Sequence, residues 1–227
     1  CGPGRGGGSV SGLRVALVDD HRLLAQSLAL ALGARGHDAA LLDPAGGVTA
    51  DVAAAPPDVV VLDLHLGAGD PAGGDRLVGA VARLAPVLVL TAETDRARWG
   101  RCLRAGARAV VSKESDLEHV VSAVEAVAAG EELLDEPERT SLLRAAVLAE
   151  RDEAARLAPF RQLTPREQAV LAAVVDGVPA LEIAQTASVS EATVRTQIRA
   201  VLAKLGVRSQ LAAAAAARRA GWQQDAA

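Results

Sequence analysis

Apolar runs alternate with amphipathic stretches over the first 130 residues of the chain. Five strand-like runs begin at residues 13, 38, 58, 87 and 107, and they read LRVALVDD, DAALLD, DVVVLDL, VLVLTA and ARAVVSK. Because nearly continuous Val and Leu is typical of strands buried on both faces, these runs predict a parallel sheet covered by helices. Helical patterns follow at 21–36, 47–55, 75–84, 94–105 and 115–129. The alternation predicts an α/β fold with a doubly wound five-stranded parallel sheet.

The chain from residue 161 contains helical patterns only. Four helices are expected, the first beginning at Pro165 and the others covering 180–187, 191–205 and 210–220. A short turn at 188–190 separates the second helix from the third, and Ser190 is a good N-cap for the third. Two helices joined by so tight a turn predict a helix-turn-helix in a small all-α domain.

Two helix starts have the spacing of a capping box, in which an N-cap hydroxyl and a Glu three residues later each bond the other's backbone N–H. In one, Thr164 precedes Pro165 and pairs with Glu167. In the other, Ser115 pairs with Glu118 at the start of the helix expected over 115–129. Both pairs predict where a helix begins.

A length of 227 residues suits two domains. The Gly-rich start predicts a disordered tail, and the acidic stretch after the last strand–helix pair predicts a helical linker. The expected division is a tail at 1–12, an α/β domain at 13–130, a linker at 131–160 and a helical domain at 161–223.

Composition and charge narrow the classes of function. With one Phe, two Trp and no Tyr, aromatic platforms for bases or sugars are nearly excluded, and two Cys exclude a disulfide framework. So few Cys point to a reducing compartment, and we therefore expect a cytoplasmic protein. No apolar stretch reaches the ~18 residues that a membrane span needs, so no membrane partner is expected. Residues from 160 onward contain eight Arg or Lys and five Asp or Glu, although the whole chain has a net charge of −4. The two halves therefore suit partners of opposite charge.

Chemically reactive side chains stand where four of the strands end. Asp19 and Asp20 follow the first run, Asp63 lies in the third, Thr91 in the fourth and Lys113 ends the fifth. The carboxyl ends of parallel strands converge on one crevice. Three carboxylates there favour Mg²⁺, with Asp20 and Asp63 as direct ligands and Asp19 acting through water. Asp63 is then the phosphate acceptor, while Lys113 and Thr91 contact phosphoryl oxygens.

Each of these residues alone also fits a solvated turn or a surface charge, but their common placement favours a site. Residues 13–130 resemble the flavodoxin-like receiver domain of two-component response regulators. The resemblance implies that a sensor histidine kinase phosphorylates Asp63 and that the backbone carbonyl of His65 completes the metal shell. It also places His65 and Glu93 at positions that influence dephosphorylation.

Two positions depart from the receiver pattern. Val110 stands where the family usually has an aromatic switch residue, three before the Lys, and Gly67 stands where a Pro is customary. An aliphatic side chain at 110 cannot report a movement of Thr91 by swinging a ring. The metal site is therefore expected to be intact, whereas the output switch is expected to be atypical.

The third helix of the C-terminal part has one apolar face and one basic face. The apolar face comprises Val194, Ile198, Val201, Leu202 and Leu205. The other side presents Arg195, Thr196 and Arg199, with Thr193, Gln197 and Lys204 as flanking phosphate contacts. Two Arg one turn apart suit the major groove of double-stranded DNA, although a solvated amphipathic helix has the same pattern.

Residues 162–220 resemble the LuxR-type helix-turn-helix domain through LTPRE, EIA and VSEATVRTQIRAVLAKLGV. The resemblance implies that Arg195, Thr196 and Arg199 face bases and that the last helix forms a homodimer. Pro179 and Leu181 depart from it, because polar or basic residues are more usual there. A receiver followed by this domain resembles the NarL/FixJ class of bacterial response regulators.

The sequence thus predicts a transcription factor, not an enzyme, whose DNA binding is controlled by phosphorylation of Asp63. One alternative is an orphan regulator of the same fold that binds DNA without phosphorylation and responds to a partner or a small ligand. A more distant alternative is a phosphatase of the phosphoaspartate type.

Overall fold

The computed structural model describes residues 12–66 and 73–223. The chain divides into two compact units, one up to Leu148 and one from Ala149 on, and each is described by itself. The expected tail at 1–12 lies outside the described residues except for Gly12, and so does Gly67. No helix in the described part is long and apolar enough to cross a membrane.

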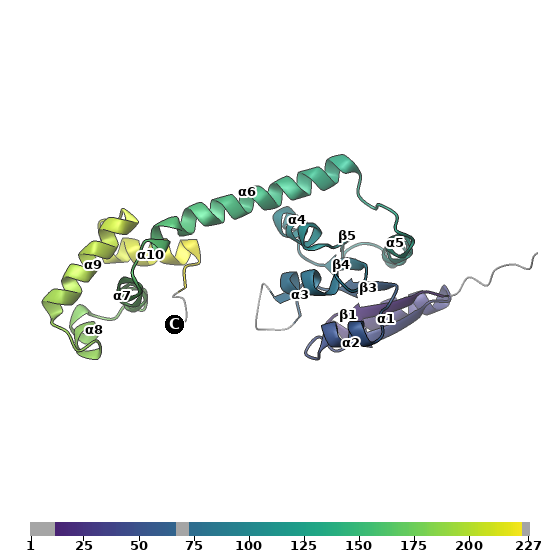
Figure 1. The fold of residues 1–227 in the computed structure, drawn as a ribbon, viewed down its shortest axis with the longest axis horizontal. Coiled ribbons are helices and arrows are strands. Elements are labelled where there is room, and N and C mark those ends of the chain that lie inside the picture. The colour runs from purple at the N-terminus through teal and green to yellow at the C-terminus, as the bar shows by residue number, and fades with distance from the viewer. Residues whose placement is uncertain (1–11, 67–72, 224–227) are drawn as a thin grey trace, which may run out of the picture. The chain divides into compact units, whose positions relative to one another are not determined.

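The first unit is built on a sheet of five parallel strands in the order β2-β1-β3-β4-β5 (Figure 1). The strands are β1 (Arg14–Val18), β2 (Asp38–Leu42), β3 (Val59–Leu62), β4 (Val87–Thr91) and β5 (Ala109–Ser112). All residues of β3 and β4 are buried, whereas edge strand β2 is largely exposed. The structure therefore confirms the five-stranded parallel sheet that the unbroken Val and Leu runs predict.

Helices cover both faces of this sheet. One apolar cluster joins one face to α1 and α5 through side chains such as Leu28 and Val124. The other cluster joins the opposite face to α2, α3 and α4 through Val52, Val78 and Leu103. The helices are α1 (Arg22–Ala34), α2 (Val48–Ala54), α3 (Gly73–Val81), α4 (Arg96–Ala105) and α5 (Leu117–Ala129). The sheet is doubly wound, as expected.

Helix α6 (Glu136–Arg161) begins in the first unit and ends in the second. Its Leu142 is fully buried in the cluster that contains Cys102 and Leu103 of α4. Arg96 of α4 donates two hydrogen bonds to the Glu138 carboxylate, at 2.9 and 3.1 Å. The first half of α6 is thus packed on α4, which its acidic composition alone does not indicate.

In the second unit, the described residues form the end of α6 and four further helices. These are α7 (Pro165–Val175), α8 (Ala180–Thr186), α9 (Glu191–Leu205) and α10 (Gln210–Ala220). Phe160 at the end of α6 stacks on Trp222, with ring centroids 5.8 Å apart. Val170 and Leu171 of α7 reach two apolar clusters, one shared with α8 and α9 and the other with α9 and α10. The structure confirms a small all-α domain.

The two predicted capping boxes have different outcomes. At α7, Thr164 accepts a hydrogen bond from the backbone N–H of Glu167, and the Glu167 carboxylate accepts one from the backbone N–H of Thr164. The box at Ser115 is wrong, because α5 begins at Leu117 with Asp116 as an N-cap that makes no side-chain capping bond. The Ser115 backbone N–H instead donates to the Ser112 carbonyl, so a turn after β5 uses this residue.

Gly100 sets the distance between α4 and α6, and its substitution tests that packing. A Cβ at this position would overlap the carbonyl oxygen of Leu142, so Gly100→Ala is expected to lower the free energy of unfolding by about 1–3 kcal/mol. Urea unfolding followed by Trp99 fluorescence, in a Trp222→Phe background, measures the change in this unit. Gly33→Ala on α1 is the matched control, because its Cβ would meet no atom within 4 Å apart from its chain neighbours and the backbone of its own helix. An equal response of the two variants would contradict close packing at Gly100.

Candidate functional site

The sheet order brings the predicted polar residues to one edge. Strands β1, β3, β4 and β5 are consecutive neighbours, and each ends at or just before one of these residues. The backbone N–H of Asp63 donates to the Val18 carbonyl at 2.9 Å, and that of Lys113 donates to the Thr91 carbonyl at 2.9 Å. Backbone hydrogen bonds therefore continue past the regular strands and fix where these side chains start.

Asp63 lies at the centre of this site and is 1% exposed. Its Oδ2 accepts a hydrogen bond from the Lys113 ammonium at 2.8 Å, and the same ammonium lies 2.8 Å from Asp19 Oδ2. Asp63 Oδ1 is buried and has no hydrogen-bond partner among the described residues. A buried carboxylate oxygen without a partner is costly unless a ligand satisfies it. The pocket therefore offers one oxygen for an incoming group.

The same carboxylates have the spacing of a metal site. One ligand atom each from Asp19, Asp20, His21 and Asp63 lies within 4.8 Å of the others. Carboxylate oxygens are the donors that a hard divalent cation prefers, so the residues present fit such an ion. His21 was not predicted for this site. Its Nδ1 lies 2.9 Å from Asp20 Oδ1 and 3.3 Å from Asp19 Oδ1, and the adjacency of His to the Asp pair was the available signal.

Thr91 ends β4 and is fully buried. Its hydroxyl oxygen accepts a hydrogen bond from the backbone N–H of Glu93 at 3.1 Å. Val110, at the position where a switch residue was expected, is 6% exposed and belongs to the apolar cluster of Cys102 and Leu103. Val110 is thus a core residue on the face that α4 covers.

A buried arginine, Arg98 of α4, joins the loops on either side of the site. Its guanidinium bonds Glu93 Oε2 at 3.2 Å and Asp75 Oδ1 at 3.1 Å, and it lies 3.3 Å from His65 Nε2. Burial alone would raise the pKa of the Glu93 carboxyl, but the hydrogen bond from Arg98, the backbone N–H groups of Asp95 and Thr94 and the charge of Arg98 together outweigh it, so the pKa is lowered. The sequence did not single out Arg98, because its partners lie on three separate segments.

In the second unit, α8 and α9 form the predicted helix-turn-helix. The turn contains Ser188 with a φ of 52°, and Ser190 caps α9 by accepting from the backbone N–H of Thr193. Val194 and Ile198 of α9 are buried against α7 and α8, and Val201 is buried in the cluster of α7 and α10, while Leu202 and Leu205 are partly buried. Pro179 caps the start of α8, and both it and Leu181 are exposed.

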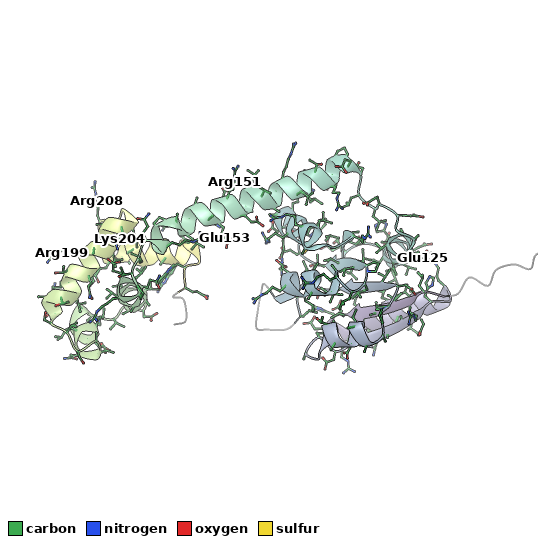
Figure 2. All side chains as sticks on the ribbon, in the orientation of Figure 1. Glu125, Arg151, Glu153, Arg199, Lys204 and Arg208 are labelled. Carbon is green, nitrogen blue, oxygen red and sulfur yellow. The ribbon has the colours of Figure 1, made fainter. Side chains whose placement is uncertain are left out.

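The residues predicted to contact DNA differ in the partners they already have. Arg195 and Arg199 are exposed on α9, where Figure 2 labels Arg199. Arg195 is paired with Glu191 of the same helix at 2.6 Å, whereas Arg199 makes no hydrogen bond or ion pair with any described residue. Thr196 is exposed and its hydroxyl donates to the Ala192 carbonyl. The Thr193 hydroxyl lies 2.8 Å from that of Ser190, and Gln197 is half-buried.

Lys204, predicted as a phosphate contact, is engaged inside the domain. Its ammonium lies 2.6 Å from Glu167 Oε2 and donates to the Gln162 carbonyl at 3.1 Å. The hydrogen bond from Lys204, followed by that from the Thr164 backbone, lowers the pKa of the Glu167 carboxyl. Lys204 thus connects the end of α9 to the capping box of α7.

Two family models match the chain. Residues 15–125 match the response regulator receiver domain, and residues 161–217 match the bacterial regulatory proteins of the luxR family. The two matches correspond to the α/β unit and to the helical unit. The residues that form the acidic pocket and helix α9 lie within them.

Relatives match almost the whole chain. The DNA-binding transcriptional activator DevR/DosR of Mycobacterium tuberculosis is 32% identical over 208 residues, which cover 89% of this chain and 92% of the relative. The response regulator RamR of Streptomyces coelicolor is 32% identical over 217 residues, covering 92% and 98%. A solved LuxR-family two-component response regulator from Aurantimonas sp. SI85-9A1 has a TM-score of 0.50 at 26% identity and covers 60% of this chain and 99% of its own.

Lys204→Met tests the structural role of this side chain. Because the pKa of Glu167 is lower in the folded chain than its ordinary value of 4.5, the ionised carboxylate stabilises the fold fully at pH values above 4.5. This stabilisation is lost as the pH falls through the pKa of the folded chain. We expect Lys204→Met to lower the free energy of unfolding by about 1 kcal/mol at neutral pH. We also expect this free energy to decrease less on acidification in Lys204→Met than in the unsubstituted chain.

Urea unfolding followed by the fluorescence of Trp222, in a Trp99→Phe background, measures this unit at several pH values. The matched control is Arg208→Met, which removes an exposed cation just beyond α9 that makes no hydrogen bond or ion pair with the described residues. The same pH dependence in Lys204→Met and in the unsubstituted chain would contradict the role of the Lys204–Glu167 pair.

Proposed function

The chain belongs to the two-component response regulators that join a receiver to a LuxR-type DNA-binding domain, and we propose that phosphorylation of Asp63 controls its binding to DNA. The family consists of transcription regulators rather than enzymes. The buried Asp63 carboxylate supports this proposal most directly, because one of its oxygens accepts from Lys113 and the other has no hydrogen-bond partner among the described residues.

Phosphorylation would proceed by attack of an Asp63 carboxylate oxygen on the phosphorus of a phosphohistidine. The new bond is an acyl phosphate, and the bond from phosphorus to the imidazole nitrogen of the kinase breaks. The Lys113 ammonium can then pair with a phosphoryl oxygen instead of the Asp63 carboxylate. The Thr91 hydroxyl can donate a hydrogen bond to another phosphoryl oxygen. This assigns a sensor histidine kinase as the partner of the receiver.

We propose that Mg²⁺ is the cation of the acidic pocket. Asp20 and Asp63 would bind it directly, Asp19 through water, and the backbone carbonyl of His65 would complete the set. The ion supplies positive charge that offsets the repulsion between the carboxylates and the phosphoryl oxygens. Asp19 is suited to a water-mediated role because Lys113 and the backbone N–H of His21 already occupy its oxygens.

Helix α9 is proposed to enter the major groove of double-stranded DNA. Arg199 would contact a base edge without losing an internal partner, whereas Arg195 would first have to leave Glu191. Thr196 is placed beside them, and Thr193, Gln197 and Lys204 flank the surface. Lys204 would have to exchange Glu167 for a phosphate, so we expect it to contribute least.

The proposed domain limits are 13–130 for the receiver, 131–160 for a helical linker and 161–223 for the DNA-binding domain. The family matches at 15–125 and 161–217 support these limits. We further propose that the regulator acts in the cytoplasm as a homodimer formed through α10. Ala213, Ala214 and Ala217 are buried in the domain's own core, whereas Ala212 and Ala215 are partly exposed and small enough to permit close approach of a second copy.

Incubation with acetyl phosphate and Mg²⁺ tests the acceptor. The full chain is expected to gain the mass of one phosphoryl group, and the gain is expected to disappear in Asp63→Asn or after chelation of the cation. Asp58→Asn is the matched control, because Asp58 stands just before β3, at the opposite end of the strand from Asp63. A phosphoryl group retained in Asp63→Asn, or none in the unsubstituted chain, would contradict the proposal.

Arg199→Ala tests whether helix α9 recognises bases. A binding site is first selected from random-sequence duplex DNA, and affinities for this site and for a scrambled duplex are then compared at several salt concentrations. We expect a loss of about 1–3 kcal/mol that is larger for the selected site than for the scrambled one. Arg161→Ala removes an equal charge at the end of α6 and serves as control. Unchanged discrimination in Arg199→Ala would remove this residue from base recognition.

A further inference from the structure

We propose that Arg98 and Trp99 fasten the segment after β4 to helix α4, so that a displacement of Thr91 reaches α4 and the first half of α6. Arg98 is then a positioning residue of the switch, in place of an aromatic residue at 110. This inference deepens the proposed function and rests on phosphorylation of Asp63.

The path starts at the Thr91 hydroxyl. A hydroxyl has one hydrogen to donate and two lone pairs to accept with. The Thr91 oxygen already accepts from the backbone N–H of Glu93 at 3.1 Å, and it keeps its own hydrogen for a phosphoryl oxygen. Both bonds can exist together. A hydroxyl drawn toward a phosphoryl group therefore draws the backbone of Glu93 with it.

Glu93 is in turn attached to the first turn of α4 by two bonds. Its carboxylate accepts from the Arg98 guanidinium at 3.2 Å, and its backbone carbonyl accepts from the indole N–H of Trp99 at 2.8 Å. The carboxylate also accepts from the backbone N–H groups of Thr94 and Asp95, which closes the connecting turn. Glu93 and the start of α4 are thus one hydrogen-bonded unit.

Burial makes the attachment at Arg98 firm. The Arg98 side chain is 9% exposed, and its guanidinium also bonds Asp75 of α3. Separation of Arg98 from Glu93, whose side chain is 29% exposed, would take one carboxylate away from this nearly buried guanidinium, and loss of a partner is costly for a buried cation. Displacement of Glu93 together with Arg98 avoids this cost. A displacement of Glu93 is therefore expected to move α4 as well, rather than only the loop between β4 and α4.

The same helix is fastened to α6 on its other side. Arg96 bonds the Glu138 carboxylate twice and donates to the Ser141 hydroxyl at 3.1 Å. One turn further, the backbone at Gly100 lies against the Leu142 carbonyl without room for a Cβ. A shift of α4 therefore changes the packing of residues 136–148. Helix α6 continues from there into the unit that contains α9.

Val110 offers no competing route. It is 6% exposed and packed with Cys102 and Leu103, so it cannot alternate between an exposed and a buried position as a ring at the surface can. Its β-branched side chain also has few accessible rotamers. The connection through Glu93 is therefore the polar coupling that we assign between Thr91 and α4.

Hydrogen exchange of the full chain tests the connection. Beryllofluoride with Mg²⁺ is used as a stable mimic of the phosphoryl group, and intact mass after treatment with acetyl phosphate is recorded in parallel. In the unsubstituted chain, exchange rates are expected to change in residues 96–105 and 136–148. In Arg98→Met, phosphoryl uptake is expected to persist while the change at 136–148 is lost.

Two further variants make the test specific. Arg101→Met is the matched control, because Arg101 lies on α4 and approaches Asp75 and Asp95 but not Glu93, and it is expected to behave as the unsubstituted chain. Trp99→Phe removes only the indole bond to the Glu93 carbonyl and is expected to reduce the change, which keeps the test decisive if Arg98→Met folds poorly.

The outcomes separate this inference from the proposed function. Absence of phosphoryl uptake and of any response to beryllofluoride in the unsubstituted chain would overturn the phosphorylation of Asp63 itself. Uptake with no response at 136–148 would overturn the inference alone. An unreduced change in exchange at 136–148 in both Arg98→Met and Trp99→Phe would also overturn the inference alone.

Discussion

The Lys113 ammonium between Asp63 and Asp19 is the contact on which the candidate site depends. Asp63 is almost completely buried, and a buried carboxylate is tolerated only when it is paired. The ammonium lies 2.8 Å from each carboxylate, so it offsets one negative charge while leaving Asp63 Oδ1 for a ligand. The pocket is therefore preorganised to bind a phosphoryl group and a cation.

This contact is possible only because the sheet is parallel and ordered as it is. Asp63 and Lys113 are fifty positions apart, yet both follow strands whose carboxyl ends lie at one edge. The strands are almost wholly aliphatic, which keeps the edge fixed while the loops beyond it hold the polar groups. The sheet positions the site, and α4 connects it to α6.

Residues with local signals were predictable from the sequence. The five strands, the Thr164–Glu167 capping box and the buried face of α9 follow from periodicity and spacing, and the structure confirms them. The position of Asp63 beside Lys113 follows from the convergence of parallel strands. Ser115 was misassigned because its spacing to Glu118 fits a capping box that the turn after β5 does not form.

Residues whose roles depend on distant partners were not predictable. Arg98 lies in a helix of ordinary pattern, and its importance comes from Glu93, Asp75 and His65, which three different segments supply. Lys204 has the spacing of a phosphate contact, but its distance to Glu167 is a property of the folded domain. The packing of α6 on α4 likewise depends on one glycine facing one carbonyl.

The dependence of DNA affinity on phosphorylation at Asp63 is the main property proposed for this chain. Its most direct test is the dissociation constant of the full chain for a selected duplex, measured with and without beryllofluoride and Mg²⁺, in the unsubstituted protein and in Asp63→Asn. We expect tighter binding on addition of the mimic in the unsubstituted protein and no change in Asp63→Asn. Equal affinities in all four conditions would contradict it and would favour a regulator of this family that binds DNA without phosphorylation.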